Sequence, residues 1–434
     1  MTNRSGRWYH LLPFFVFVGL FFVSTLWFEG RLSPIFAAVI AVIVSFFTFP
    51  SGISFNEKVA TFIAGSANSI IISMSLIFIE SSIFTYVLNL IGSTDAAVKL
   101  GMCVMPSNFL LPGLFLITAV FATAVGSSMG TIAAILPIGI AIANKIGIPL
   151  QLMAGTIVGA SMLGDNLSLI SDTTIAATRT TDSRMKDKFK ANVKLVSVAA
   201  ALTLAVLVYL NMQYPYQCIG SFGTVDLMND LFLVSPYLLV LVLALIGFDV
   251  VGVLLIGILY TLLVGIGNGT FGFLTSTTMF LEGFARDRAI DEVLLLAIVI
   301  AGLSKVVETN GGLNYLLKRL SSNVKSKGGA EVAISVLIFL VNAVTAINTV
   351  AILIAGPIAS KIGKQFGIAN KRVACLLDIF SCVCQGILPY APQLLLAQSI
   401  AHVSSISIIP YLYYQGFIFL VMIFSIGKTF LKEK

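Results

Sequence analysis

Charged residues are scarce in this sequence. Lys, Arg, Asp and Glu make up 10% of its 434 residues, whereas a soluble domain carries roughly 25%. So little charge cannot cover a water-facing surface of this size. Hydrophobic residues make up 58% of the chain, and its mean hydropathy is +1.01. The composition therefore excludes an ordinary soluble protein and predicts the lipid bilayer as a partner.

Histidine and cysteine are also rare. The two histidines, His10 and His402, lie near opposite ends of the chain, and no His-Glu-x-x-His motif occurs. The cysteines form no Cys-x-x-Cys pair, and all lie in or beside apolar blocks: Cys103, Cys218, Cys375, Cys382 and Cys384. We therefore interpret them as small packing residues. The sequence predicts no cofactor and no enzyme, and a membrane-embedded enzyme is the weakest of three functional hypotheses.

Apolar residues come in blocks of about 17 to 25, the length that crosses a bilayer as a helix. Examples are Leu11–Phe28, Ser69–Ile91, Val193–Leu210, Val250–Ile266 and Ile408–Ile426. The blocks lack the alternation of membrane strands, and lipid cannot satisfy an open backbone. The sequence therefore predicts an all-α polytopic membrane protein with about ten spans. Because no small-residue cleavage site follows it, we interpret the first block as a retained signal anchor.

The net charge of +7 does not indicate nucleic acid, because the basic residues lie in the gaps between apolar blocks. Arg179–Lys194 holds six basic residues, Lys318–Glu331 and Lys361–Arg372 hold four each, and the tail is basic. The gap Asn211–Asp230 has no Lys or Arg, and Gln398–Pro410 has only His402. By the positive-inside rule, both termini and the basic gaps are predicted to be cytoplasmic and the other two gaps outside.

The two parts of the chain resemble each other at a shift of 220 residues. Pro137 then falls on Pro357 and Asp165 on Gln385, and the order of apolar blocks repeats. The basic loops fall at opposite places in the two parts, which indicates opposite orientation. We therefore expect an inverted repeat of two five-span halves, residues 1–212 and 213–434, forming one membrane domain. Such repeats are typical of secondary transporters, although duplication without transport would also produce one.

Each half contains two short apolar pieces joined by a polar tip. Phe109–Val125 and Thr131–Ala143 flank the first tip, and Val332–Val344 and Val350–Ile362 flank the second. A re-entrant hairpin fits this pattern, but two ordinary short helices would give the same topology. Candidate binding residues at the tips are Ser127, Ser128, Thr131, Thr345, Asn348 and Thr349.

Each half also contains an interrupted span. Gln151–Thr178 carries the polar residues Asp165, Asn166, Ser168, Ser171, Asp172, Thr173 and Thr174. A helix break at Asp165–Ser168 would arrange these side chains around one cavity. A carboxylate within a span costs several kcal/mol and is by default functional, although Asp172 could simply end the helix in water. In the second half Pro389 and Pro392 break the helix, and Gln385 stands opposite Asp165, so the site should be asymmetric.

Four other charged residues within spans are candidates for a charge relay: Glu80, Lys305, Glu308 and Asp378. Lys305 and Glu308 are one helical turn apart and could instead neutralise each other. Asp249 lies between two spans and is interpreted as a turn residue.

The stretch Gly159–Thr174 resembles the NhaC-type sodium/proton antiporter family. That family carries a similar Gly-Ala-Ser-x-x-Gly-Asp-x-x-Ser-Pro-x-Ser-Asp-Thr-Thr motif, with Leu169 here in place of its proline. The resemblance implies scaffold and transport domains, two re-entrant hairpins and two broken helices, often in a homodimer that works as an elevator. It also implies a cation-binding motif at Asp165, Ser168, Asp172, Thr173 and Thr174.

Our first hypothesis is a sodium/proton antiporter of the cytoplasmic membrane. Asp165 would bind the transported Na⁺ or a proton, but not both, with hydroxyl and carbonyl oxygens beside it. The second tip would close the site from the cytoplasmic side. The alternative hypothesis is a sodium- or proton-coupled transporter of an amino acid or small organic anion, with Gln385, Gln393 and the two tips forming the substrate site.

Overall fold

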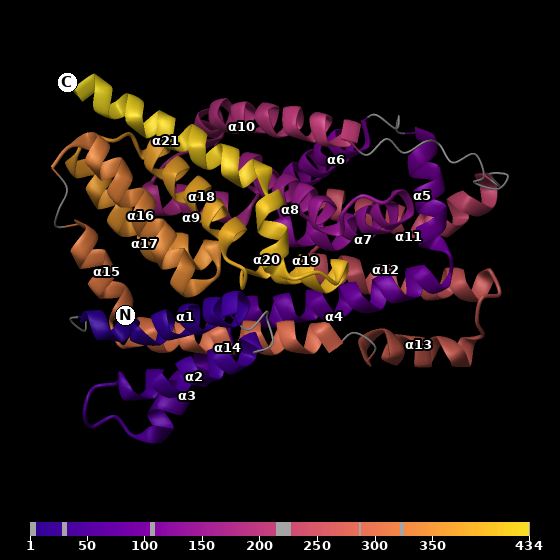
Figure 1. The fold of residues 1–434 in the computed structure, drawn as a ribbon, viewed down its shortest axis with the longest axis horizontal. Helices are drawn as coiled ribbons and strands as arrows, with labels where there is room; N and C mark the ends of the chain where they lie inside the picture. Colours follow the sequence, from indigo (N-terminus) through magenta and orange to yellow (C-terminus); the bar gives the residue numbers. More distant parts are fainter. Residues whose placement is uncertain are drawn as a thin grey trace.

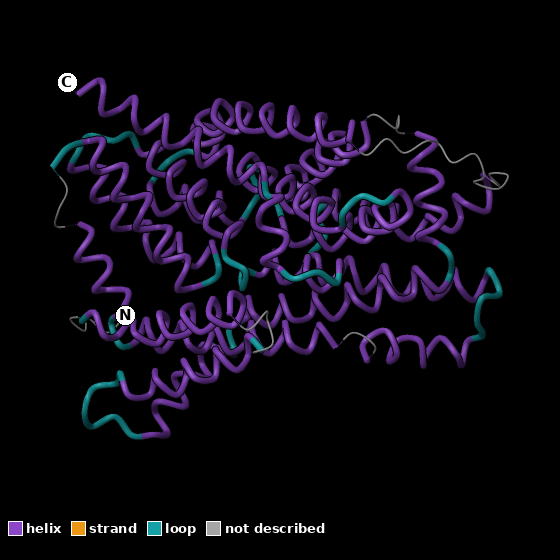
Figure 2. Tube along the Cα trace, in the orientation of Figure 1, coloured by secondary structure: helices purple, strands orange, loops and turns teal. Residues whose placement is uncertain are grey.

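The computed structural model describes residues 6–27, 33–104, 109–213, 227–285, 288–321 and 325–433. Within these ranges every regular element is a helix and no strand occurs (Figure 2). Among the described residues, eight helical segments are long and apolar enough to span a membrane, one of them the interrupted segment Asn370–Ala401, and three shorter apolar helices accompany them. The predicted all-α membrane fold is therefore confirmed, and the count of about ten spans stays a prediction.

The helices up to residue 213 form the first part of the chain. They are η1 (Trp8–Leu11), α1 (Leu12–Trp27), α2 (Pro34–Phe47), α3 (Phe55–Ser66), α4 (Ser69–Leu90), α5 (Ser93–Val104), α6 (Leu110–Val125), α7 (Ser128–Ile146), α8 (Leu150–Leu167), α9 (Asp172–Thr181) and α10 (Met185–Gln213). Their ends follow local chemistry: Ser54 and Glu57 form a capping box at α3, and Gly126 and Gly147 end α6 and α7 in the left-handed conformation.

The second part contains the remaining helices. They are α11 (Leu227–Ile246), α12 (Val250–Gly267), α13 (Phe273–Ala285), α14 (Arg288–Thr309), α15 (Gly312–Ser321), α16 (Lys327–Thr345), α17 (Asn348–Gln365), α18 (Asn370–Ile387), α19 (Pro392–Ala401), α20 (Ser405–Ile408), η3 (Ile409–Tyr411) and α21 (Tyr413–Glu433). In Figure 1, α15 and the C-terminal end of α21, both rich in basic residues, lie at the same end of the molecule.

The predicted blocks agree with these helices except at the last one. The span predicted at Ile408–Ile426 starts too early, because Pro410 lies in the short helix η3 and α21 begins only at Tyr413. Phe28, Cys218 and most of the gap Asn211–Asp230 lie outside the described residues.

Two helix pairs with sharp connections stand at the predicted tips. Gly126 and Ser127 join α6 to α7, and Ala346 and Ile347 join α16 to α17. Gly126 has φ 73° and Ala346 has φ 56°, so the second tip places a side chain in the left-handed region that usually favours glycine. The helices of each pair pack against each other.

The two predicted interruptions are also present. The first separates α8 from α9 at Ser168–Ser171, and the second separates α18 from α19 at Leu388–Ala391. The predicted break at Asp165–Ser168 is too early by a few residues. The Ser168 amide still donates to the Gly164 carbonyl (2.7 Å), so Asp165 and Asn166 lie in the last turn of α8. No proline is needed, because the Thr174 hydroxyl donates to the freed Ser168 carbonyl (2.9 Å).

The elements around the interruptions interlock across the chain. α9 packs on α17 and α18, whereas α19 packs on α4, α7 and α8. α10 and α21 lie along one side of this group, and α1, α2, α3 and α14 lie along another (Figure 1). Segments far apart in the sequence therefore meet at the centre, where the helices are interrupted.

Candidate functional site

All four helix connections meet at one cavity of about 300 Å³. Its walls come from the tips of the two helix pairs, the first interruption, the helix ends on either side of the second interruption, α4 and the start of α12. Nine of the predicted site residues line it: Ser127, Ser128, Asp165, Ser171, Asp172, Thr173, Asn348, Thr349 and Gln385. Residues from both parts of the chain thus form one polar space.

Asp165 is the most enclosed carboxylate of this cavity, with 4% of its surface exposed. Its Oδ1 accepts a hydrogen bond from the Ser128 amide (3.1 Å) and one from the Ser171 hydroxyl (3.4 Å). The Ser128 amide belongs to the N-terminus of α7, where the helix dipole favours a negative charge. Neither donor is a charged group, so the carboxylate can still interact with a cation.

Five predicted site residues do not line the cavity. The Thr131 hydroxyl donates to the Ser127 carbonyl (2.8 Å), and that of Thr345 donates to the Ile347 carbonyl (3.3 Å), so both stabilise their tips. Ser168 and Thr174 hold the interruption between α8 and α9. Asn166 points away from the cavity, where its Oδ1 accepts from the Tyr414 hydroxyl (2.8 Å).

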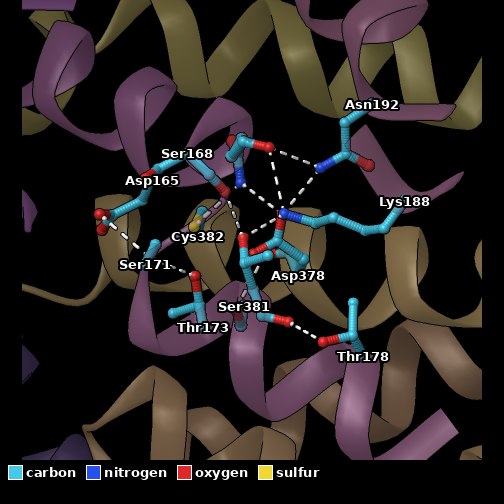
Figure 3. A network of polar contacts seen from close by, with 12 residues as sticks. Asp165, Ser168, Ser171, Thr173, Thr178, Lys188, Asn192, Asp378, Ser381 and Cys382 are labelled. Atoms are coloured by element: carbon cyan, nitrogen blue, oxygen red, sulfur yellow. Dashed lines mark hydrogen bonds and ion pairs between the residues drawn. The ribbon is translucent and has the colours of Figure 1, made fainter. Parts of the chain in front are cut away.

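A polar network lies behind Asp165, on the side toward α10 and α18 (Figure 3). Lys188 and Asp378 form an ion pair at 2.8 Å, with side chains 1% and 0% exposed. Asn192 and Asn166 also donate to the Oδ2 of Asp378, at 2.8 and 3.2 Å. Lys188 donates further to the Asn166 carbonyl (3.1 Å) and the Thr174 hydroxyl (2.6 Å).

This network corrects the interpretation of Lys188. Its sequence position places it among six basic residues of a loop predicted to face the cytoplasm. The structure buries Lys188 in α10, where its ammonium donates to the Asn166 carbonyl at the C-terminal end of α8 and pairs with Asp378. Asp378 is therefore paired, and it does not line the cavity.

The other candidate relay residues also lie outside the cavity. Lys305 and Glu308 pair with each other at 3.1 Å and are partly exposed, as the neutralisation alternative predicted. Glu80 is 4% exposed, and its Oε2 has no hydrogen-bond partner among the described residues. It lies one helical turn beyond Ile77, which does line the cavity.

Sequence reasoning missed three polar wall residues: Ser69, Ser73 and Asp249. Asp249 caps α12, since its Oδ1 accepts from the Val251 amide (3.0 Å), so the predicted turn role is also present. Ser69 and Ser73 are spaced one turn apart in an apolar helix, and this spacing is a signal that could have found them.

The cavity also receives the N-termini of α7, α9, α12, α17 and α19. Those of α9, α17 and α19 lack a side-chain cap. Helix N-termini carry partial positive charge and bind anions. The walls therefore offer carboxylates to a cation and uncapped helix starts to an anion.

The residues Gly126–Gly130 also fit the letters Gly-x-Ser-x-Gly of a serine hydrolase. In that motif the serine lies between a strand and a helix and needs a histidine partner. Here the segment joins two helices, and neither His10 nor His402 lines the cavity. The match therefore lacks the structural context of a nucleophile.

The family model and the related sequences that match this chain are named as antiporters. The model of the Na⁺/H⁺ antiporter family matches residues 4–212 and 227–431. The arginine/ornithine antiporter ArcD of Halobacterium salinarum is 23% identical, over 84% of this chain and 81% of its own length. The malate-2H⁺/Na⁺-lactate antiporter of Bacillus subtilis is 23% identical, over 83% and 82%.

The Na⁺/H⁺ antiporter NhaC of Bacillus subtilis is 23% identical, over 76% of this chain and 79% of its own length. Among solved structures, the YdaH transporter of Alcanivorax borkumensis aligns over 97% of this chain and 98% of its own, with a TM-score of 0.41 and 15% identity.

Proposed function

Because the chain belongs to the Na⁺/H⁺ antiporter family, it is a multi-pass secondary transporter, and we propose that it exchanges Na⁺ for H⁺ through the buried carboxylate of Asp165. The family match also confirms the resemblance found at Gly159–Thr174. We place the protein in the cytoplasmic membrane, with its basic gaps on the cytoplasmic side.

The observation that supports this proposal is the setting of Asp165. It is a buried carboxylate on a polar cavity, with only neutral hydrogen-bond donors to its Oδ1. Oxygen ligands suit a hard cation such as Na⁺, and oxygen atoms of Ser127, Asp172 and Thr173 lie along the same walls. Because a carboxylate must lose its proton to hold a cation, Na⁺ and H⁺ would exclude each other.

We further propose that residues 1–212 and 213–434 are inverted repeats. The support is the recurrence of two features in each part: a helix pair with a sharp tip, and a helix interrupted in mid-course. Pro137 in α7 and Pro357 in α17 occupy similar places in the two pairs. In this arrangement the second tip would close the cavity from the cytoplasmic side.

The test uses purified protein in sealed liposomes that contain a pH-sensitive dye. Na⁺ added outside should drive H⁺ out and raise the internal pH. Asp165→Asn should abolish this response, while Asp95→Asn, which alters a carboxylate with 73% exposure, should keep it. Wild-type exchange by Asp165→Asn protein would refute the role of this carboxylate.

A second candidate function is coupled transport of a small organic anion or amino acid, and two observations favour it. A cavity of about 300 Å³ holds far more than a bare ion, because one water molecule takes about 30 Å³. Buried Oε1 atoms of Gln385 and Gln393, on its walls, have no partner among the described residues, and such acceptors suit the N–H or O–H donors of a solute such as an amino acid. Sodium-dependent uptake of a labelled carboxylate by the same liposomes, without a pH response to Na⁺ alone, would favour this function.

A further inference from the structure

A second polar cavity, of about 290 Å³, lies beside the central one. Its walls come from α4, α13 and α19, and most of its lining side chains are polar: Ser81, Ser82, Thr85, Tyr86, Asn89, Ser399 and His402. It resembles the central cavity in size and polarity, yet it contains none of the residues discussed above as binding groups. Its place in the molecule therefore needs an explanation.

One row of residues on α4 connects the two cavities. Ser69, Ser73, Ile77, Ser81 and Thr85 follow at intervals of four, so they lie along one gently turning face of the helix. The first three line the central cavity, and the last two line the second cavity. Ile77 is the only apolar residue in this row.

Helix α19 runs beside α4 in the same direction. Its first residues, Pro392 and Gln393, line the central cavity, and Ser399 and Ile400 line the second. Leu396 lies one turn from both Gln393 and Ser399 and is fully buried. Ile77 and Leu396 therefore occupy the stretch of each helix that separates the two cavities.

The second cavity also has unsatisfied polar groups. Ser81 is fully buried, and among the described residues neither its hydroxyl nor that of Thr85 has a partner. A buried hydroxyl without a partner costs free energy, so such groups indicate water or a polar passenger. The Tyr86 hydroxyl, on the cavity wall, donates to the exposed carboxylate of Glu282 (2.8 Å), which places a negative charge next to the cavity.

We propose that this second cavity is the outer vestibule of the transport path, that it admits hydrated cations, and that Ile77 and Leu396 form the apolar barrier between it and the central cavity. The proposal rests on the proposed function as a cation transporter. The outer side follows from the gap Gln398–Pro410, which contains His402 and carries no Lys or Arg. The hydroxyls of Ser81, Ser82 and Thr85 replace part of a hydration shell without holding the ion.

The vestibule is tested by thiol labelling in sealed vesicles of known orientation. Ser82→Cys, at a half-buried position on the cavity wall, should react with a membrane-impermeant cationic methanethiosulfonate added outside, at least ten times faster than with its anionic counterpart. The matched control is Leu76→Cys on the exposed face of the same helix, which should stay unlabelled in lipid. The parent protein gives the background from native cysteines. Thr85→Cys, also half-buried on the wall, serves if Ser82→Cys protein is poorly folded.

The apolar barrier is tested by labelling a cysteine on its far side, in the central cavity. Ser73→Cys should react slowly with the same outside reagent, and the addition of Leu396→Ala should accelerate the reaction at least tenfold. Equal rates with and without Leu396→Ala, labelling of Ser82→Cys only from the inner side, or faster reaction with the anionic reagent would each overturn the proposal. Labelling needs no Na⁺ exchange, so failure of the exchange assay would leave this result independent.

Discussion

Loss of the Lys188 ammonium alone should destabilise the protein more than loss of both the Lys188 and the Asp378 charges. Lys188 places its three N–H donors on Asp378, Asn166 and Thr174. In Lys188→Met, the carboxylate of Asp378 remains fully buried without a cation. In the double variant Lys188→Met/Asp378→Asn that charge is gone, and the carbonyl oxygen of the new amide side chain can still accept from Asn192.

The size of the effect is the difference between two losses of stability: one when a single partner of the ion pair is removed, and one when both charges are removed. Leaving one partner of a buried ion pair alone costs about 3–5 kcal/mol. The double variant loses two hydrogen bonds of about 0.5–1.5 kcal/mol each, so it should cost about 1–3 kcal/mol. The two substitutions should therefore be coupled, with about 2 kcal/mol regained by the second one.

The assay heats the purified protein in detergent and measures by size-exclusion chromatography how much folded protein remains at each temperature. The order of stability should be wild type, then the double variant, then Lys188→Met. Arg184→Met serves as the matched control, because it removes a basic residue from an exposed pair with Asp187 and should change stability by less than about 1 kcal/mol. A double variant less stable than Lys188→Met would refute the reasoning.

Three other predictions follow from the cavity and its packing. Gly164→Ala should destabilise the protein by about 1–3 kcal/mol, because a Cβ there would overlap the backbone of Ala122; Gly416→Ala, which meets open space, should be tolerated in the same unfolding assay. The apparent KM for Na⁺ should fall as external pH rises from 6 to 8, since protons compete for Asp165; a pH-independent KM in liposomes would contradict this competition. Gln393→Ala, which removes a contact to Ser128 (3.2 Å), should weaken solute binding at least several-fold with little loss of folded protein, as measured by uptake kinetics.

The fold could be predicted from the sequence where the physics is local. The lengths of apolar blocks predicted the spans, and glycine, proline and polar runs predicted both tips and both interruptions. Asp165 could be found because a carboxylate in a span is costly and rarely accidental. The exact position of the first break could not, since it depends on the hydrogen bond from Thr174 back to Ser168.

Long-range partners could not be predicted. Lys188 stands in a basic run, and its charge alone indicates a cytoplasmic loop. Only the packing of α10 on α18 brings it to Asp378. Asp249 fits a cap from the sequence, but its place on the cavity wall depends on how α12 meets α4 and α7. These residues show that a site built at helix junctions is defined by tertiary contacts as much as by motifs.

Early helices that pack on late ones, as α9 packs on α17 and α18, must wait during synthesis until the later helices have been made. Asn192 and Asp378 are 186 residues apart, and ribosomes add about 5–20 residues per second. For roughly 10 to 40 s, the newly made Lys188, Asn192 and polar stretch around Asp165 have no partner from the later helices. During that interval the nascent chain must be kept from lipid and from proteases, so a membrane insertase or chaperone that shelters unpaired polar segments should be most important for this protein before residue 378 emerges.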